Sequence, residues 1–299
     1  MLAIVIPYYK LVFFEETLKS LSGQTDKRFK VYIGNDASPE DPSLLLEQYK
    51  DKLDFVYQSF DNNLGSISLS QQWDRCIALI DDEKWIMILG DDDYLDQNIV
   101  KSWYENFDAF NNKTCIVRYA IKRVGEKQNN NTSFYTHPIW EKASNSYFRR
   151  LKGETRSSLS EYVFSKETYL KYGFKSYPLA WHSDDKAWLD FSDKKNIYSI
   201  NESNVFVRIS DFSITGKTNN EGLKNKASED FYKDILIQNL DIFDKNQRLE
   251  LLFIYEVAII KNRNLKLKDW LYLIKLYSKN FRIVPFLKFI RRFLISIKS

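Results

Sequence analysis

The stretch WIMILGDDDYL, residues 85–95, runs from five consecutive apolar residues into a glycine and three aspartates. A short apolar run that ends at a turn signal predicts a buried β-strand. The three aspartates then follow the carboxyl end of that strand. Parallel α/β sheets bind ligands at this edge, so the stretch predicts both a fold class and the position of a site.

The segments around this stretch alternate between strand and helix patterns. Strands are predicted at residues 2–6, 29–34, 53–58, 84–89 and 114–121, and helices at 14–24, 41–50, 66–80 and 96–110. Such alternation predicts βαβ units and an α/β fold, with a Rossmann-like, mostly parallel sheet flanked by helices. The polar loops at residues 7–9, 35–38 and 90–93 should then converge on one edge of the sheet.

The second half of the chain divides differently. A strand is predicted at 159–165, a helix at 166–174, a second helix from about Ser183, and a strand followed by a loop around 205–220. From Ala227 to the end the pattern is helical and is interrupted only by Pro285. We therefore expect one domain over residues 1–225, with a nucleotide-sugar half (1–120) and an acceptor half (121–225), and a helical extension over 226–299.

Composition narrows the class of protein. The 299 residues include 44% hydrophobic residues, enough for a large core, and only two cysteines, each in an apolar-periodic segment. A disulfide framework is therefore not expected, and a reducing, cytoplasmic location is. The N-terminus lacks a basic region and its apolar run ends at Pro7, unlike a signal peptide. No apolar run is long enough to span a bilayer.

The net charge of +4 is unevenly distributed, since residues 261–299 carry eleven Lys or Arg and one acid. Such a tail is typical of chains that bind an anionic partner. A helix from Pro285 would place four apolar residues on one face, with Leu287 and Leu294 beside them: Phe286, Ile290, Phe293 and Ile297. This face either packs on the protein or lies in an anionic membrane surface, and the clustered cations favour the membrane, on the inner face of the plasma membrane. No nucleic-acid-binding motif accompanies the tail.

The three aspartates have two interpretations. One of them could cap the helix that begins near Gln97. Three adjacent carboxylates are better explained by a compensating cation, and Mg²⁺ or Mn²⁺ is typically bound by one or two carboxylates together with substrate phosphates. The spacing therefore favours a site for a divalent metal and a diphosphate.

Other acids and cations suggest partners for that site. Asp36 follows a strand and could form an Asx-turn before Pro39 or bind a nucleobase or ribose. Asp184 and Asp185 could complement a helix dipole, or one could serve as a general base among aromatic residues. Arg208 and Lys217 are candidate cations for a diphosphate.

Taken together, AIVIPYYK, FEETLKSLSGQT, FKVYIGNDASPED, NNLGSISLSQQWDRCIAL and WIMILGDDDYL resemble, in order and spacing, the inverting family 2 glycosyltransferases of the GT-A fold. The resemblance is close over about the first 120 residues and looser to Lys217. It implies a metal-assisted transfer of a hexose or N-acetylhexosamine from a nucleotide-sugar, usually a UDP-sugar. The acceptor would be a saccharide or lipid-linked saccharide, as in the assembly of a bacterial surface polysaccharide.

The same resemblance assigns roles to residues. It implies that Pro7, Tyr8 and Asp36 contact the nucleotide and that Gly65 lies in the donor-binding loop. Asp92 falls on the main metal position, with Asp93 beside it and Asp91 nearer the ribose or donor sugar. Asp185 matches the presumed catalytic base, with Asp184 as its neighbour and the choice between them open.

Two departures from the family pattern stand out. Gly90 occupies the place of a usual acid, and Ser183-Asp184-Asp185 replaces the Glu-Asp pair. A non-catalytic nucleotide-sugar-binding module and a metal-dependent phosphohydrolase are the alternative functions. The phosphohydrolase is the less favoured because DDDYL lacks the Thr or Val that its nucleophile motif would need.

Overall fold

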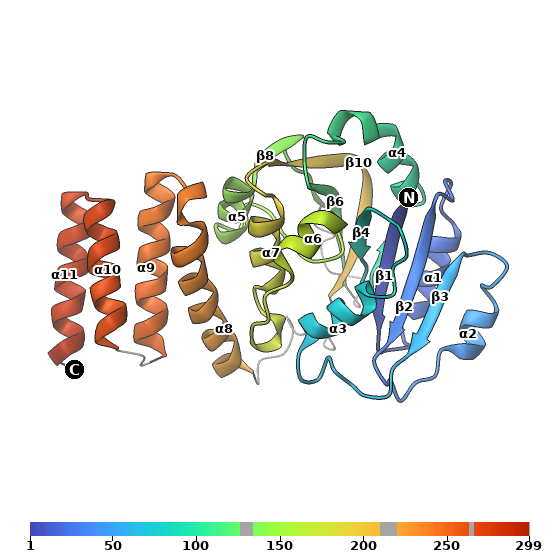
Figure 1. The fold of residues 1–299 in the computed structure, drawn as a ribbon, viewed down its shortest axis with the longest axis horizontal. Helices are drawn as coiled ribbons and strands as arrows, with labels where there is room; N and C mark the ends of the chain where they lie inside the picture. Colours follow the sequence, from blue (N-terminus) through green and yellow to red (C-terminus); the bar gives the residue numbers. More distant parts are fainter. Residues whose placement is uncertain (126–133, 210–219, 263–265, 299) are drawn as a thin grey trace. The chain divides into compact units, whose positions relative to one another are not determined.

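The computed structural model describes residues 1–125, 134–209, 220–262 and 266–298 (Figure 1). The chain forms two compact units. The first comprises Met1–Ser176 and Ser183–Lys217, and the second comprises Tyr177–His182 and Thr218–Ser299. The boundary expected between residues 225 and 226 falls inside a continuous helix, α8 (Glu221–Asp234).

The first unit is built on a parallel half-sheet. Its strands are β1 (Leu2–Tyr8), β2 (Phe29–Asn35), β3 (Phe55–Ser59) and β4 (Trp85–Ile88), in the order β3-β2-β1-β4. Helices α1 (Phe14–Ser22), α2 (Ser43–Glu47) and α3 (Leu69–Ile77) connect them. All four residues of β4 are buried, as a strand covered on both faces requires. Since β2 and β4 flank β1 on opposite sides, the strand order reverses beside β1, where α/β sheets bind ligands.

The rest of the sheet is mixed, so the expected mostly parallel arrangement holds only for the first four strands. Strand β9 (Tyr162–Ser165) inserts antiparallel between β4 and β6 (Ile116–Gly125). Strand β10 (Asn196–Ile209) runs parallel to β6 and antiparallel to β5 (Tyr94–Leu95). The short strands β7 (Phe134–Tyr135) and β8 (Trp140–Lys142) pair with β6 and β10.

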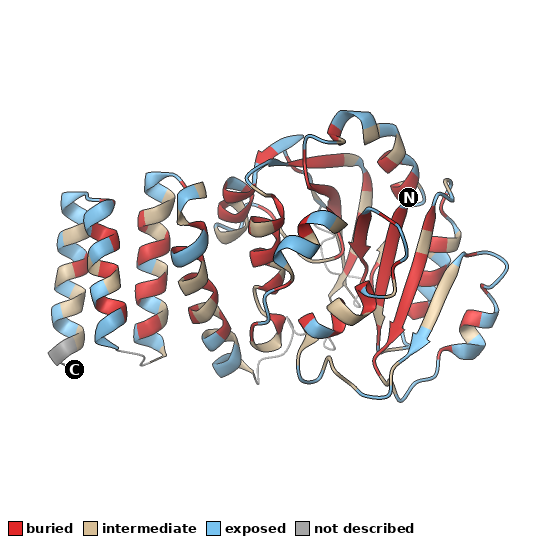
Figure 2. Cartoon of the chain, in the orientation of Figure 1, coloured by how far each residue is buried: buried red, intermediate tan, exposed pale blue. Residues whose placement is uncertain are grey.

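Four helices complete this unit. They are α4 (Ile99–Phe110), α5 (Ala143–Leu151), α6 (Lys166–Tyr172) and α7 (Ser183–Phe191). Helix α4 packs on β10, while α7 contacts α5 and α6. Alternate apolar side chains of β1, β2 and β4 form one buried cluster with Trp103 and Phe110 of α4. Figure 2 shows these strands as largely buried, and the polar loops follow their ends.

The second unit is helical. After the 3₁₀ turn η1 (Pro178–Ala180) and α8, it continues through the turns η2 (Ile235–Asn239) and η3 (Leu240–Ile242) to α9 (Lys245–Lys261), α10 (Leu267–Lys279) and α11 (Ile283–Lys298). Asp244 and Gln247 form a capping box that begins α9. The interruption expected at Pro285 falls a few residues before it, since α10 ends at Lys279 and α11 begins at Ile283. Pro285 lies in the first turn of α11, where the missing N–H would have no intrahelical partner.

Among the helices of the described residues, none is both long and apolar enough to cross a membrane.

Candidate functional site

The loops that follow β1, β2 and β4 are joined by hydrogen bonds. The Asp91 carboxylate accepts from the amides of Tyr9 and Lys10 at 2.7 and 2.8 Å. The Ser38 hydroxyl donates to the carbonyl of Tyr9 at 2.6 Å, and the amide of Asp36 donates to the carbonyl of Tyr8 at 3.0 Å. The convergence of the three loops on one edge of the sheet is thereby confirmed.

Asp93 is a structural carboxyl. Its Oδ2 accepts a hydrogen bond from the Ser160 hydroxyl at 2.5 Å, and its Oδ1 accepts one from the amide of Arg208 at 2.8 Å. Burial and then the negative charge of Asp92 raise its pKa to about 8. Both oxygens therefore accept hydrogen bonds from β10 and the 157–161 segment, which makes Asp93 less suited than Asp92 to the metal role predicted for it.

Asp91 and Asp92 have different surroundings. Burial raises the pKa of Asp91 to about 6, although the hydrogen bonds from the amides of Lys10 and Tyr9 lower it. Burial also raises the pKa of Asp92, while Lys10 and Arg208 lower it. Within the part of the chain that the structure describes, the Asp92 carboxylate accepts no hydrogen bond from another residue. Of the three, Asp92 has both carboxylate oxygens available to a ligand, whereas Asp91 accepts both amides at one oxygen, Oδ2.

Gly90 lies close to two of the carboxylates. A Cβ at this position would lie 3.0 Å from Oδ1 of Asp92 and 3.1 Å from Oδ2 of Asp93. Any larger residue here would require these carboxylates to shift by a few tenths of an ångström.

The carboxylates of this loop could hold a divalent metal only together with the phosphates of a bound ligand. No group of three His, Cys, Asp or Glu side chains within the described residues could hold a metal. A single carboxylate is nevertheless sufficient for Mg²⁺ or Mn²⁺ when phosphate oxygens and waters supply the remaining ligands. Asp92 meets this requirement.

Asp36 organises the loop between β3 and α3. Its buried carboxylate accepts from the amides of Leu64 and Gly65 at 2.7 and 2.9 Å and forms an ion pair with Arg75. A Cβ on Gly65 would collide with Oδ2 of Asp36. Arg75 also lies over the ring of Phe60, at 4.0 Å from its centroid. Asp36 and Gly65 are thus brought together, with Arg75 as a cation that sequence patterns did not identify.

The side chain of Tyr8 does not face a ligand. It is fully buried, its ring lies 4.6 Å from that of Phe14, and its hydroxyl donates to the carbonyl of Glu40 at 2.7 Å. Pro7, which pairs with Gly34 one residue before the end of β1, is partly exposed, and Tyr9 is exposed. The aromatic side chain available at this loop is therefore Tyr9.

Arg208 is brought to the acidic loop as expected. Its Nε donates to the carbonyl of Asp92 at 3.1 Å, and its guanidinium pairs with Glu16 and lies 4.1 Å from the centroid of Phe13. This places a cation beside the proposed diphosphate position. Lys217 lies outside the described residues.

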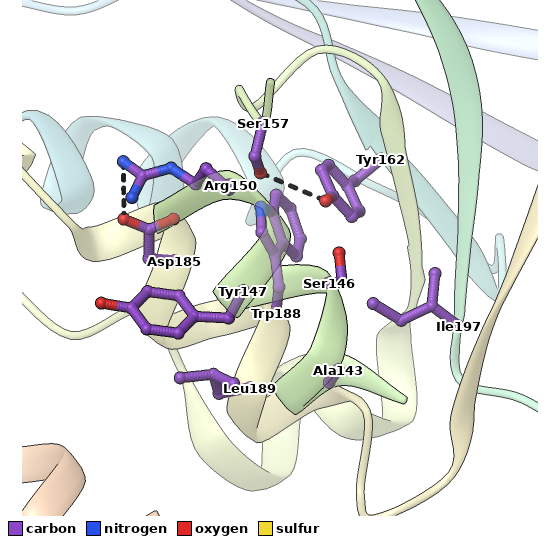
Figure 3. Close-up of a pocket in the computed structure, with 10 residues that line it drawn as sticks. All are labelled: Ala143, Ser146, Tyr147, Arg150, Ser157, Tyr162, Asp185, Trp188, Leu189 and Ile197. Atoms are coloured by element: carbon purple, nitrogen blue, oxygen red, sulfur yellow. Dashed lines mark hydrogen bonds and ion pairs between the residues drawn. The ribbon is translucent and has the colours of Figure 1, made fainter. Parts of the chain in front are cut away.

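The second acidic pair lies at the start of α7. The Asp185 carboxylate is buried, pairs with Arg150 at 2.9 Å and lines a small pocket with Tyr162 and Trp188 (Figure 3). The pocket has room for about one water molecule. Asp185 therefore faces a closed space, and its charge is already balanced.

Asp184 differs from its neighbour. It is partly exposed, and among the described residues no side chain pairs with its carboxylate. Burial, and secondly the negative charge of Asp185, raise its pKa to about 7, although the positive charge of Arg150 lowers it. A carboxyl that titrates near neutral pH can take up a proton from a hydroxyl group.

The 157–161 segment links the two acidic regions. Ser160 binds Asp93, and the neighbouring Glu161 carboxylate contributes to the raised pKa of both Asp93 and Asp184. The two regions therefore lie close enough to interact electrostatically. Neither Ser160 nor Glu161 belongs to a recognisable motif, so their roles required the structure.

This fold and site agree with the comparisons. The model of Glycosyl transferase family 2 matches residues 3–176, more than half of the chain. The chain belongs to glycosyl transferase family 2. The family explains the order of the polar loops after β1, β2 and β4, and the chain is a glycosyltransferase with a GT-A fold.

Solved structures support the fold of this family 2 glycosyltransferase. The crystal structure of S. aureus TarS 1–349 is 13% identical, with a TM-score of 0.65 over 93% of this chain and 80% of that chain. The crystal structure of TarS 1–349 with UDP-GlcNAc gives the same values, and the complex with UDP has a TM-score of 0.60, 13% identity, and coverage of 95% and 81%. No curated protein matches the chain.

Proposed function

We propose that this family 2 glycosyltransferase transfers a sugar from a nucleoside diphosphate donor, with inversion at the anomeric carbon. The observation that carries the proposal is the junction of the β1, β2 and β4 loops through Asp91 and Asp36. In an α/β sheet this is the edge that binds nucleotides. A UDP-sugar is the favoured donor because TarS, which has a similar fold, was crystallised with UDP-GlcNAc and with UDP.

The donor would lie across the three loops. The Asp92 carboxylate would hold Mg²⁺ or Mn²⁺ against the diphosphate, and the bound ion would supply positive charge to the leaving group. Arg208 would add a second positive charge there, since it already contacts the carbonyl of Asp92. The exposed ring of Tyr9 and the loop around Gly65 are the remaining candidates for contact with the nucleotide.

Asp184 is the favoured catalytic base. It would accept the proton of the acceptor hydroxyl while that oxygen bonds to the anomeric carbon and the bond from this carbon to the diphosphate oxygen breaks. Its pKa of about 7 suits this transfer, whereas Asp185 is paired with Arg150. This assignment exchanges the roles that the family resemblance suggested for the two residues.

The acceptor is proposed to be a saccharide or lipid-linked saccharide of a surface polysaccharide, reached from the cytoplasmic side. The donor sugar would be a hexose or an N-acetylhexosamine. A non-catalytic binding module would bind the nucleotide without consuming any donor, whereas a phosphohydrolase would release free phosphate from simple esters. A single assay can therefore distinguish a binding module and a phosphohydrolase from an enzyme that transfers the sugar.

The test is donor consumption by Asp184→Asn and Asp185→Asn proteins with a panel of labelled nucleotide-sugars and saccharide acceptors. We expect Asp184→Asn to reduce turnover by at least about 10²-fold with nucleotide binding retained. Asp185→Asn should keep a measurable fraction of wild-type turnover. Retained turnover in Asp184→Asn, with loss in Asp185→Asn, would return the base assignment to Asp185.

A further inference from the structure

The exposed side of α11 carries large apolar side chains, which are unusual on a surface in contact with water. Five large apolar side chains are each at least 54% exposed there, and we call them the outer face of α11: Ile283, Val284, Leu287, Leu294 and Ile295. Their spacing of three, four, seven and eleven residues places them on one side of the helix. Two further exposed side chains, Leu267 and Leu271, lie one turn apart on the neighbouring α10.

The opposite side of α11 is already occupied. Phe289 is fully buried, and its ring lies 4.4 Å from that of Tyr277, while Phe293 lies 5.1 Å from Trp270. Arg292 pairs with the buried carboxylate of Glu256 on α9. Of the apolar side that the sequence pattern offered to a membrane, Phe293 packs within the helical unit, whereas Leu287 and Leu294 at its edge belong to the exposed outer face. The side chain of Ile297 lies outside the described residues.

The charges around the outer face have one sign. Between residues 266 and 298 the only acid is Asp269, which is buried and pairs with Lys233 at 2.8 Å. Lys288 and Arg291 are exposed on α11 beside the apolar side chains, and Lys268, Lys275 and Lys279 are exposed on α10. An exposed apolar stripe bordered by uncompensated cations is the pattern of a helix that lies in a membrane interface.

We propose that the outer face of α11, with the exposed side of α10, docks onto an anionic lipid surface. The apolar side chains would enter the boundary between headgroups and acyl chains, and the cations would contact lipid phosphates. A second copy of the chain is a poorer occupant, because pairing two such faces would bring like charges together. A nucleic acid would leave the apolar side chains exposed to water. The proposal does not depend on the proposed reaction.

Vesicle sedimentation with the full chain tests the proposal. Vesicles of phosphatidylcholine alone are compared with vesicles that also contain phosphatidylglycerol. The charge variant, Lys288→Gln with Arg291→Gln, should reduce the partition coefficient on anionic vesicles on the order of 30-fold, because each cation contributes about fivefold. The apolar variant, Leu287→Glu with Leu294→Glu, should reduce it at least about tenfold.

The matched control is Leu44→Glu with Leu170→Glu, which changes two exposed leucines of α2 and α6 in the other unit. It should bind vesicles like the wild type. Equal binding of the wild type to neutral and anionic vesicles, or unchanged binding by both variants, would overturn the proposal. A wild-type dimer that the apolar variant converts to a monomer on size exclusion would assign the face to a second copy instead. Nucleoside diphosphate binding, measured on every preparation, confirms folding and reports separately on the proposed function.

Discussion

Gly65 is required by the carboxylate that it approaches. Because a Cβ would collide with Oδ2 of Asp36, Gly65→Ala should displace this carboxylate from the amides of residues 64 and 65. We expect a loss of about 1–3 kcal/mol in the free energy of unfolding, measured by urea denaturation, and weaker nucleotide binding.

Gly222→Ala is the control for that substitution, since a Cβ there meets no atom within 4 Å. In helix α8 it should be neutral or stabilise by about 0.5–1 kcal/mol. If the two variants shift the urea midpoint in the same direction by the same amount, the collision is not the cause.

The pH dependence of turnover should report on Asp184. Its pKa is raised to about 7, so the group is protonated below that pH and available as a base above it. We expect kcat/KM to rise as pH increases through about 7. Asp185→Asn removes the neighbouring charge that raises this pKa, so the rise should move to lower pH. An unmoved profile in Asp185→Asn would contradict the coupling.

Sequence patterns located the acidic loops but not the division of labour within them. Adjacent aspartates look alike in a sequence, and their roles depend on which amides and hydroxyls point at each carboxylate. Asp93 is satisfied by Ser160 and Arg208, which lie 67 and 115 residues away in the chain. Arg75 and Arg150 were missed for the same reason, because only tertiary contacts bring them to the acids.

At the level of elements, the contact between α9 and α11 depends on one buried charge. Glu256 is fully buried, binds Arg292 through both carboxylate oxygens and accepts from the Tyr277 hydroxyl at 3.2 Å. Glu256→Gln should cost about 1–2 kcal/mol, less than a fully buried pair because Arg292 is partly exposed. Amide hydrogen exchange in residues 283–298 should accelerate about tenfold.

Glu250→Gln is the matched control, since Glu250 lies on the same helix and is only partly buried. It should leave exchange in α11 unchanged. Equal acceleration by both variants would show that net charge, and not the pair with Arg292, controls this helix.

Strands and helices with a clear hydrophobic pattern could be predicted, but the pairing of the strands in the sheet could not. The first four strands were expected within a few residues of β1 to β4, because each is a short apolar run ended by polar loop residues. The antiparallel insertion of β9 was not foreseen, since neither strand direction nor neighbour order is encoded in hydrophobic periodicity. The break expected at Pro285 lies instead at residues 280–282, because proline is tolerated in a first helical turn and α11 can begin before it.

For the whole molecule, the family assignment and the GT-A fold were predictable because five motifs occur in a fixed order. The place of the 177–182 segment in the second unit was not, because this segment precedes α7 in the chain. The outer face of α11 could not be predicted either, because its recognition requires knowing which side of each helix is already packed.

The central claim is that the edge formed by the β1, β2 and β4 loops binds a nucleoside diphosphate with a metal held by Asp92. Titration calorimetry of UDP into the wild type, with Mn²⁺ or with a chelator, tests it directly alongside Asp92→Ala and the exposed control Asp108→Ala. We expect affinity to fall at least about tenfold on chelation, and Asp92→Ala to be equally weak with and without Mn²⁺, because the site holds the ion through one carboxylate. Asp108→Ala should match the wild type. UDP binding that is unaffected by chelation and by Asp92→Ala, or no binding of any nucleoside diphosphate, would contradict the claim.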